Sequence, residues 1–166
     1  MRKKIILFVL LFAWLGLIFY FSSQPSDESS RLSGKTLDLI INVIEKIFNH
    51  KFSEDELNYI TINFLVPLRK LAHFTLYFIL GIIIYFLNKC FFHDRKTVCF
   101  TLLICVLYAI SDEFHQLFVP GRACEFKDIM VDSFGSVVGL LFIKLIERIT
   151  LYNKLHNKNE VYKCEK

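Results

Sequence analysis

The hydrophobic positions of this chain fall into four long runs separated by polar segments. The runs cover residues 5–21, 71–87, 98–117 and 129–146. Each has roughly the 17–25 residues that a helix needs to cross a bilayer. A backbone in lipid must satisfy its hydrogen bonds internally, so runs of this length predict helices. The pattern therefore predicts an all-α integral membrane protein with four transmembrane helices.

The third run is unusual because its apolar part is too short to span a membrane. Residues 98–110 number 13, which gives about 20 Å of helix against a bilayer core of about 30 Å. The helix must therefore continue through Asp112, Glu113 and His115. Ionisable groups are costly inside a membrane, and they usually mark a functional site.

The charge distribution predicts the orientation of the spans. Basic residues precede the first run, lie between the second and third runs, and outnumber acidic residues after the fourth; they include Arg2, Lys3, Lys4, Lys89, Arg95, Lys96 and Lys144. Positive residues favour the cytoplasmic side, so we expect both termini inside, with a membrane domain over 1–150 and a basic cytoplasmic tail over 151–166. The net charge of +4 then reflects membrane orientation, and no nucleic-acid partner is expected.

The segment between the first two spans, residues 22–70, predicts a long extracytoplasmic loop that carries short amphipathic helices. Apolar residues recur at helical spacing from Leu37 to Phe48, which is typical of a helix lying on the membrane surface. Ser53 followed by Glu56 is a capping-box pattern and predicts a second short helix. Pro67 then indicates the entry to the second span.

Polar side chains gather at the extracytoplasmic ends of three predicted spans. His73 follows Arg69 at i, i+4 spacing, so the two share a helix face near the start of the second span. The third span ends in the ionisable residues described above. Asp128 directly precedes the fourth run, where we interpret it as a helix cap, and Asp132 lies one turn further on. Convergence from three segments predicts an outward-facing polar site.

Three segments of the chain resemble the signature blocks of the VanZ-like family: FSSQPSDESSRLSG (21–34), RKLAHFTLY (69–77) and SDEFHQLFVPGRACEFKDIMVDSFGSVVG (111–139). The resemblance covers most of the chain. It implies a small bacterial membrane protein, in a family whose founding member is associated with reduced susceptibility to the glycopeptide teicoplanin. It also implies a site made of the matching polar positions, which are Arg69, Lys70, His73, Asp112, Glu113, His115, Gln116, Arg122, Asp128 and Asp132.

One hypothesis for the polar residues is binding. Arg69, Lys70 and Arg122 would hold the phosphate or carboxylate of a cell-wall lipid precursor, or a lipoglycopeptide drug, at the outer leaflet. Arginine suits this role because its planar fork pairs with either anion through two hydrogen bonds. An apolar groove between helices would hold the lipid tail, and the outcome would be lower sensitivity to glycopeptides.

A second hypothesis is a membrane-embedded hydrolase or transferase that acts on a lipid-linked phosphate or acyl group. Asp112, Glu113 and His115 are then the catalytic candidates. Imidazole and carboxylate side chains also suit a divalent metal. The sequence contains no established zinc motif, nucleophile elbow or phosphate loop. No cofactor or metal ligand is therefore assigned, and a divalent metal stays an open alternative.

A third hypothesis is structural: the acidic and basic residues pair with one another and hold the helices together. Gly135 and Gly139 form a G-x-x-x-G pair. This pattern also predicts a structural role, namely close contact between two helices. The sequence does not indicate an oligomeric state.

Overall fold

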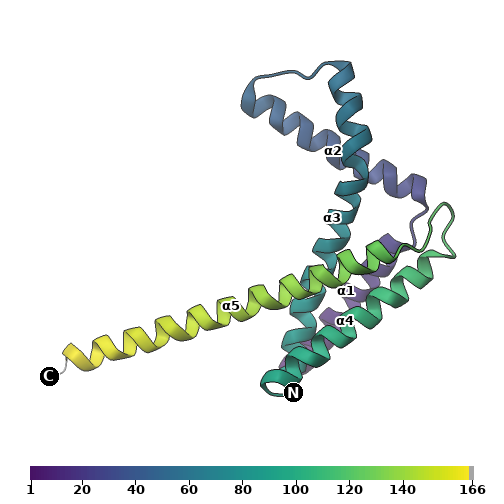
Figure 1. The fold of residues 1–166 in the computed structure, drawn as a ribbon. Helices are drawn as coiled ribbons and strands as arrows, with labels where there is room; N and C mark the ends of the chain where they lie inside the picture. Colours follow the sequence, from purple (N-terminus) through teal and green to yellow (C-terminus); the bar gives the residue numbers. More distant parts are fainter. Residues whose placement is uncertain (165–166) are drawn as a thin grey trace.

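The computed structural model of the protein describes residues 1–164, without the side chains of residues 94, 155 and 157–164. Within this part the chain is all-helical and contains no strand (Figure 1). Its five helices are α1 (Arg2–Ser22), α2 (Ser26–Phe48), α3 (Glu54–Asn88), α4 (Asp94–Gln116) and α5 (Phe126–Cys164). Four of them, α1, α3, α4 and α5, are long and apolar enough to cross a membrane. The predicted number of spans is therefore confirmed, and the protein is a multi-pass membrane protein.

The segment over residues 22–70 differs from the loop that the sequence predicts. Most of it is helical, because α2 is one helix of 23 residues and α3 already begins at Glu54. The predicted capping box is present: the Ser53 hydroxyl accepts from the Glu56 backbone N–H, and the Glu56 carboxylate accepts from the Ser53 N–H. The predicted separate short helix is wrong, however, since this segment is the first part of α3.

Pro67 lies inside α3, so the prediction that it marks the entry to this helix is wrong. A proline removes one backbone donor and leaves one carbonyl of the previous turn unpaired. Pro67 is exposed, so its surroundings can satisfy that carbonyl, and extending an existing helix costs less than nucleating a new one. At 35 residues, α3 is about 52 Å long, well beyond a bilayer core of about 30 Å. Its first part and α2 therefore form an arm at one end of the bundle (Figure 1).

Helix α2 packs against α3 through part of its apolar surface. Leu37 and Ile41 are buried, whereas Ile40, Ile47 and Phe48 are exposed. The chain itself thus covers only some of the apolar positions of α2. Contact of the remaining positions with a membrane surface stays a prediction.

The bundle core forms where α1, α3 and α4 meet, and it contains Ile18, Tyr77, Leu80, Ile84, Cys105 and Ala109. Helix α5 approaches α3 closely because glycines on each of the two helices lie against the backbone of the other. A Cβ atom built on Gly135 would lie 2.4 Å from the Phe74 carbonyl oxygen, and one on Gly139 would lie 2.1 Å from that of Phe78. The predicted G-x-x-x-G contact is confirmed, and it fixes the register of α3 against α5.

The two ends of the bundle differ in character. At one end, the Lys4 ammonium lies 4.2 Å from the centre of the Phe91 ring, so the basic N-terminus lies beside the basic α3–α4 connection. Lys89 forms an ion pair of 2.6 Å with Glu147 of α5 at this end. At the other end, the Ser26 N–H donates to the Pro120 carbonyl over 3.2 Å, which joins the α1–α2 turn to the α4–α5 loop.

Helix α5 continues far beyond the predicted fourth span and projects away from the bundle (Figure 1). The predicted tail over 151–166 therefore begins as part of this helix. Residues 165 and 166, and the side chains of residues 157–164, lie outside the described structure.

Candidate functional site

A polar pocket lies at the end of the bundle formed by the α1–α2 turn and the α4–α5 loop. Its walls come from the middle of α3, the C-terminus of α4, the α4–α5 loop and the first turns of α5. The lining residues are Arg69, Lys70, His73, Gln116, Arg122, Asp128, Val131 and Asp132. The lining of this pocket thus includes all the sequence-predicted site residues except Asp112, Glu113 and His115, which lie near the end of α4.

The close packing of α3 on α5 places the histidine opposite the acidic residues. On α3, His73 lies one turn after Arg69, so both face the pocket. On α5, Asp132 lies one turn after Asp128 and three residues before Gly135, the glycine that contacts the α3 backbone. As a result the His73 Nδ1 atom is 4.0 Å from the Asp132 Oδ2 atom.

Lys70 is paired within the protein. Its ammonium donates to the carboxylates of Asp128 and Glu125, the latter over 3.3 Å. The interpretation of Asp128 as a helix cap is wrong, because α5 already begins at Phe126 and Asp128 lies in its first turn. Lys70 and Asp128 instead form an ion pair that joins α3 to α5 in the lining of the pocket.

Arg122 ties the α4–α5 loop to the end of α1. It donates from Nε to the Gln24 carbonyl over 3.1 Å, from Nη2 to the Phe21 carbonyl over 3.4 Å, and from Nη1 to Gln116 Oε1 over 3.2 Å. Burial and the nearby charge of Arg69 lower its pKa from the ordinary value, which is so high that the guanidinium stays charged. These partners are neutral, so the Arg122 charge has no direct ion pair in the described chain.

Arg69 differs from the other two basic residues of the pocket. Its side chain is half-buried, yet it forms no hydrogen bond or ion pair with any part of the chain that the structure describes. A guanidinium offers five donors in a planar fork. Arg69 therefore presents an unused anion-binding group to the pocket.

Three buried carboxylates lie at or beside the pocket, and they differ in how well they are satisfied. Asp112 Oδ2 accepts from the Ser22 hydroxyl over 2.8 Å and from the Tyr77 hydroxyl over 3.2 Å. Glu113 Oε1 accepts from the Glu125 N–H over 2.7 Å. Within the described residues, Glu113 Oε2 and Asp132 Oδ1 are buried with no hydrogen-bond partner.

His115 faces α1 and not the pocket. Its ring stacks on Phe19 with 4.5 Å between ring centres, and its Nε2 atom lies 3.1 Å from the Ser23 hydroxyl. Ser22, Gln24 and Glu125 also contribute to the site, although no sequence pattern predicted them. Ser22 immediately follows the first apolar run, a position where a hydroxyl can face polar groups on neighbouring spans, and this was its one available signal.

An apolar groove adjoins the polar pocket and shares Arg69 and His73 with it. The groove runs between α1, α2 and α3, and its apolar lining includes Trp14, Phe21, Leu32, Leu68, Leu71, Leu76 and Ile79. A charged pocket and an apolar groove thus meet at one arginine and one histidine.

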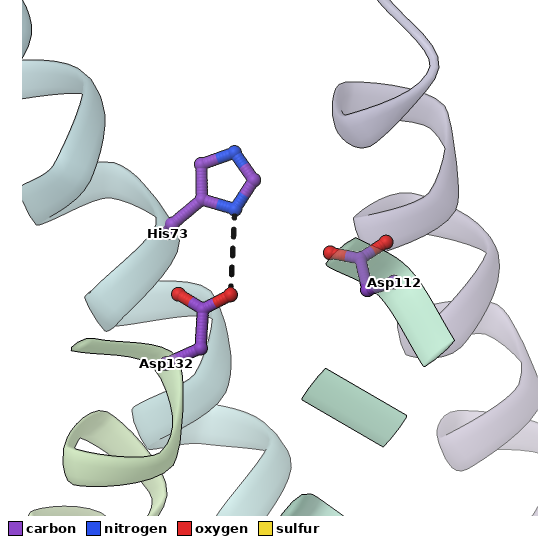
Figure 2. Close-up of side chains that lie close together, drawn as sticks. All are labelled: His73, Asp112 and Asp132. Carbon is purple, nitrogen blue, oxygen red and sulfur yellow. Dashed lines mark ion pairs between the residues drawn. The ribbon is translucent and has the colours of Figure 1, made fainter. Parts of the chain in front are cut away.

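His73, Asp112 and Asp132 come from α3, α4 and α5 and face a common point (Figure 2). One possible ligand atom from each lies within 4.8 Å of the others. Among the described residues this is the cluster of histidine and carboxylate side chains that is close enough to hold a metal ion.

Comparison with known proteins gives one match. A family model described as VanZ/LLP1 matches residues 7–147, which is most of the chain. Among curated proteins and among solved structures, nothing matches the chain.

Proposed function

The chain belongs to the VanZ/LLP1 family, and on that basis we propose that it binds the anionic headgroup of a cell-envelope lipid and thereby lowers sensitivity to glycopeptide antibiotics such as teicoplanin. The observation that carries this proposal is the position of Arg69. Its guanidinium has no partner in the described chain and lies where the polar pocket meets the apolar groove. A ligand with a charged head and an apolar tail matches both surfaces.

The chemistry of the pocket favours a phosphate or carboxylate as the head. Arg69 offers a free planar fork, which pairs with either anion through two parallel hydrogen bonds. Arg122 adds a second, partly buried positive charge, and its neutral partners leave that charge uncompensated by a direct ion pair within the described residues. Lys70 is a weaker candidate, because Asp128 and Glu125 already occupy its ammonium.

The groove suits a hydrocarbon chain. Trp14 and Leu76 line it, and the Trp14 indole N–H donates to the Leu76 carbonyl over 2.9 Å. The polar atom of this tryptophan is therefore satisfied, and its apolar surface is free for a lipid tail. Binding the tail here would leave the head within reach of Arg69.

We further propose that the pocket faces the extracytoplasmic side. The N-terminal basic residues and the α3–α4 connection lie together at the opposite end of the bundle, and basic segments favour the cytoplasm. Both termini would then lie inside, and the pocket would open near the outer leaflet, where lipid-linked cell-wall precursors are exposed to a drug.

Binding is tested with the purified full chain in zwitterionic detergent. Polyprenyl phosphate is titrated in, with phosphatidylglycerol and phosphatidylcholine as comparison lipids, and affinity is read by native mass spectrometry and fluorescence. We expect Arg69→Ala to weaken polyprenyl phosphate binding at least tenfold. Arg148→Ala is the matched control, because Arg148 is an exposed arginine on α5 outside both the pocket and the groove, and it should bind like wild type. Equal binding by Arg69→Ala and wild type would refute the headgroup site.

The cellular consequence is tested separately. The wild-type chain, Arg69→Ala and Arg148→Ala are expressed at matched membrane abundance in a glycopeptide-susceptible Gram-positive host. Teicoplanin and vancomycin susceptibilities are then measured. Reduced teicoplanin sensitivity with wild type and Arg148→Ala, but not with Arg69→Ala, is the expected result. If the purified chain binds teicoplanin directly and ignores the lipids, the drug itself is the ligand.

A second candidate function is hydrolysis or transfer at a lipid-linked phosphate or acyl group. It is favoured by the position of partly buried His73 beside buried Asp132, with their facing atoms 4.0 Å apart. A histidine oriented by a carboxylate is a common general base. Release of inorganic phosphate from a polyprenyl pyrophosphate by wild type, abolished in Asp132→Asn, would establish catalysis. Unchanged substrate after prolonged incubation would leave binding as the function.

A further inference from the structure

The carboxylate of Asp132 is deeply buried, and among the described residues it pairs with no lysine or arginine. Its side chain is 4% exposed, and in the described structure its Oδ1 atom has no hydrogen-bond partner. Its other oxygen faces His73 Nδ1 at 4.0 Å, which is beyond hydrogen-bond range. Burying a polar group without a partner costs free energy, and burying a charge without one costs far more. Something else is therefore expected to satisfy this group.

A second buried acid shares the same space. Asp112 is 4% exposed and reaches the cluster from α4 (Figure 2). The cations of the pocket do not neutralise these two acids by direct pairing in the described chain. Lys70 pairs with Asp128 and Glu125, and Arg122 contacts carbonyl and amide oxygens. Two acids and a histidine thus converge without a cation of their own.

We infer that His73, Asp112 and Asp132 form a binding site for a divalent transition-metal ion. One imidazole and two carboxylates are a donor set suited to ions such as Mn²⁺ and Zn²⁺. The cluster comes from three different helices, so it is held by the packing of α3, α4 and α5 and not by one flexible loop. Three protein ligands leave coordination positions open for water or for an anion in the pocket.

The distances are close to those that coordination requires. Two ligands bound at about 2.1 Å in tetrahedral geometry are about 3.4 Å apart. The atoms of His73 and Asp132 are 4.0 Å apart, and the ligand atoms of all three residues lie within 4.8 Å of one another. Side-chain rotations would have to close this gap of about 1 Å when an ion binds.

The surroundings of Asp112 also fit a metal ligand. Ser22 and Tyr77 both donate to Asp112 Oδ2. These two hydrogen bonds fix the orientation of the carboxylate, and neither of them uses Oδ1. Ligating carboxylates are commonly held by such outer hydrogen bonds. Tyr77 is fully buried, with 0% exposure, so this support belongs to the rigid core of the bundle.

The inference concerns the same pocket as the proposed function but does not require lipid binding. A bound ion would give the pocket a positive centre beside Arg69 and Arg122, which would strengthen its hold on a phosphate. Measuring metal binding in the absence of lipid tests the metal site separately from the proposed lipid binding. Lipid binding by metal-free protein would leave the proposed function intact, even if no metal binds.

The test uses Mn²⁺ and the purified full chain in zwitterionic detergent without anionic lipid. Mn²⁺ is preferred as the probe because it favours oxygen and imidazole ligands and avoids the thiols of the chain's five cysteines. Stoichiometry is measured by mass spectrometry of the metal after desalting, and affinity by electron paramagnetic resonance. Wild type is expected to bind one Mn²⁺ per chain, with the nitrogen coupling of a coordinated imidazole visible in the pulsed spectrum.

Variants assign the ligands. Asp132→Asn and His73→Gln should each lower the affinity for Mn²⁺ at least tenfold, and His73→Gln should abolish the nitrogen coupling. Asp38→Asn is the matched control, because Asp38 is an exposed aspartate on α2 outside the pocket, the groove and the cluster; it should keep one tightly bound Mn²⁺. Thermal unfolding of each variant in EDTA shows whether it is folded. The inference is overturned if wild type binds no stoichiometric Mn²⁺, if its spectrum lacks nitrogen coupling, or if folded Asp132→Asn binds like wild type.

Discussion

Helices α3 and α5 approach each other closely at two glycines of α5, and substitution of these glycines tests the contact directly. In Gly139→Ala the new Cβ atom would lie 2.1 Å from the Phe78 carbonyl oxygen, and in Gly135→Ala it would lie 2.4 Å from that of Phe74. Ordinary van der Waals contact begins at 3.4 Å. The helices must therefore part locally by about 1 Å, since a carbonyl oxygen of a helix cannot rotate away as a side chain can.

The size of the effect follows from two opposing terms. Alanine is a better helix former than glycine by about 1 kcal/mol. Overpacking a well-packed contact typically costs about 1–3 kcal/mol, and sometimes more when rigid backbone is involved. Because the obstacle is rigid backbone, we take the overpacking cost at the upper end of its range, about 3 kcal/mol. After the gain of about 1 kcal/mol from alanine, we expect Gly139→Ala to lower the free energy of unfolding by about 2 kcal/mol. Gly135→Ala should cost somewhat less, because its clash is smaller.

The assay is unfolding of the purified chain in mixed detergent micelles, followed by circular dichroism. Gly16→Ala on α1 is the matched control: an alanine Cβ at that position meets nothing within 4 Å, so this variant should unfold at or above the wild-type midpoint. Gly135→Ala should also disturb the site, because Gly135 lies three residues after Asp132. If Gly139→Ala unfolds no earlier than Gly16→Ala, the close approach of α3 and α5 is refuted.

Three further substitutions test the polar contacts. Arg122→Lys keeps the charge but loses the fork that reaches three oxygens, so it should lower the free energy of unfolding by about 1.5–3 kcal/mol; an unchanged unfolding midpoint would show that the charge alone matters. Tyr77→Phe removes one of the two donors to buried Asp112, and we expect a loss of about 1–3 kcal/mol by the same assay, whereas a more stable variant would contradict the hydrogen bond. Ser53→Ala removes the capping box with Glu56, which should cost about 1 kcal/mol and speed amide exchange in the first turn of α3; unchanged exchange there would show that the cap is dispensable.

Much of the membrane architecture could be predicted from local sequence. Lipid forces helices, and the length of an apolar run sets whether a helix can cross, so the four runs predicted four spans. The predicted capping box at Ser53 is present because it depends only on residues three apart. The prediction failed at Pro67, which lies within α3, because a proline on an exposed helix face can be tolerated when neighbouring turns are already formed.

The candidate site was only partly predictable for a related reason. Convergence of polar residues from three spans follows from topology, and most of the predicted residues do line one pocket. Spacing could not show that His115 turns toward Phe19 or that Asp128 pairs with Lys70. Those partners lie far away along the chain, and a helical pattern fixes only the face on which a side chain lies.

By itself the sequence determined the helical membrane class, the number of spans and the polar residues at their ends, because each depends on local hydrophobicity and on the cost of unsatisfied backbone groups in lipid. The tertiary structure decided which of those residues meet. Among the described residues it left Arg69 without a partner, where the polar pocket joins the apolar groove, and it brought His73, Asp112 and Asp132 together from three helices. The physical reason is that these contacts depend on the register and rotation of packed helices. The glycine contacts between α3 and α5 set that geometry, and no single segment of the chain encodes it.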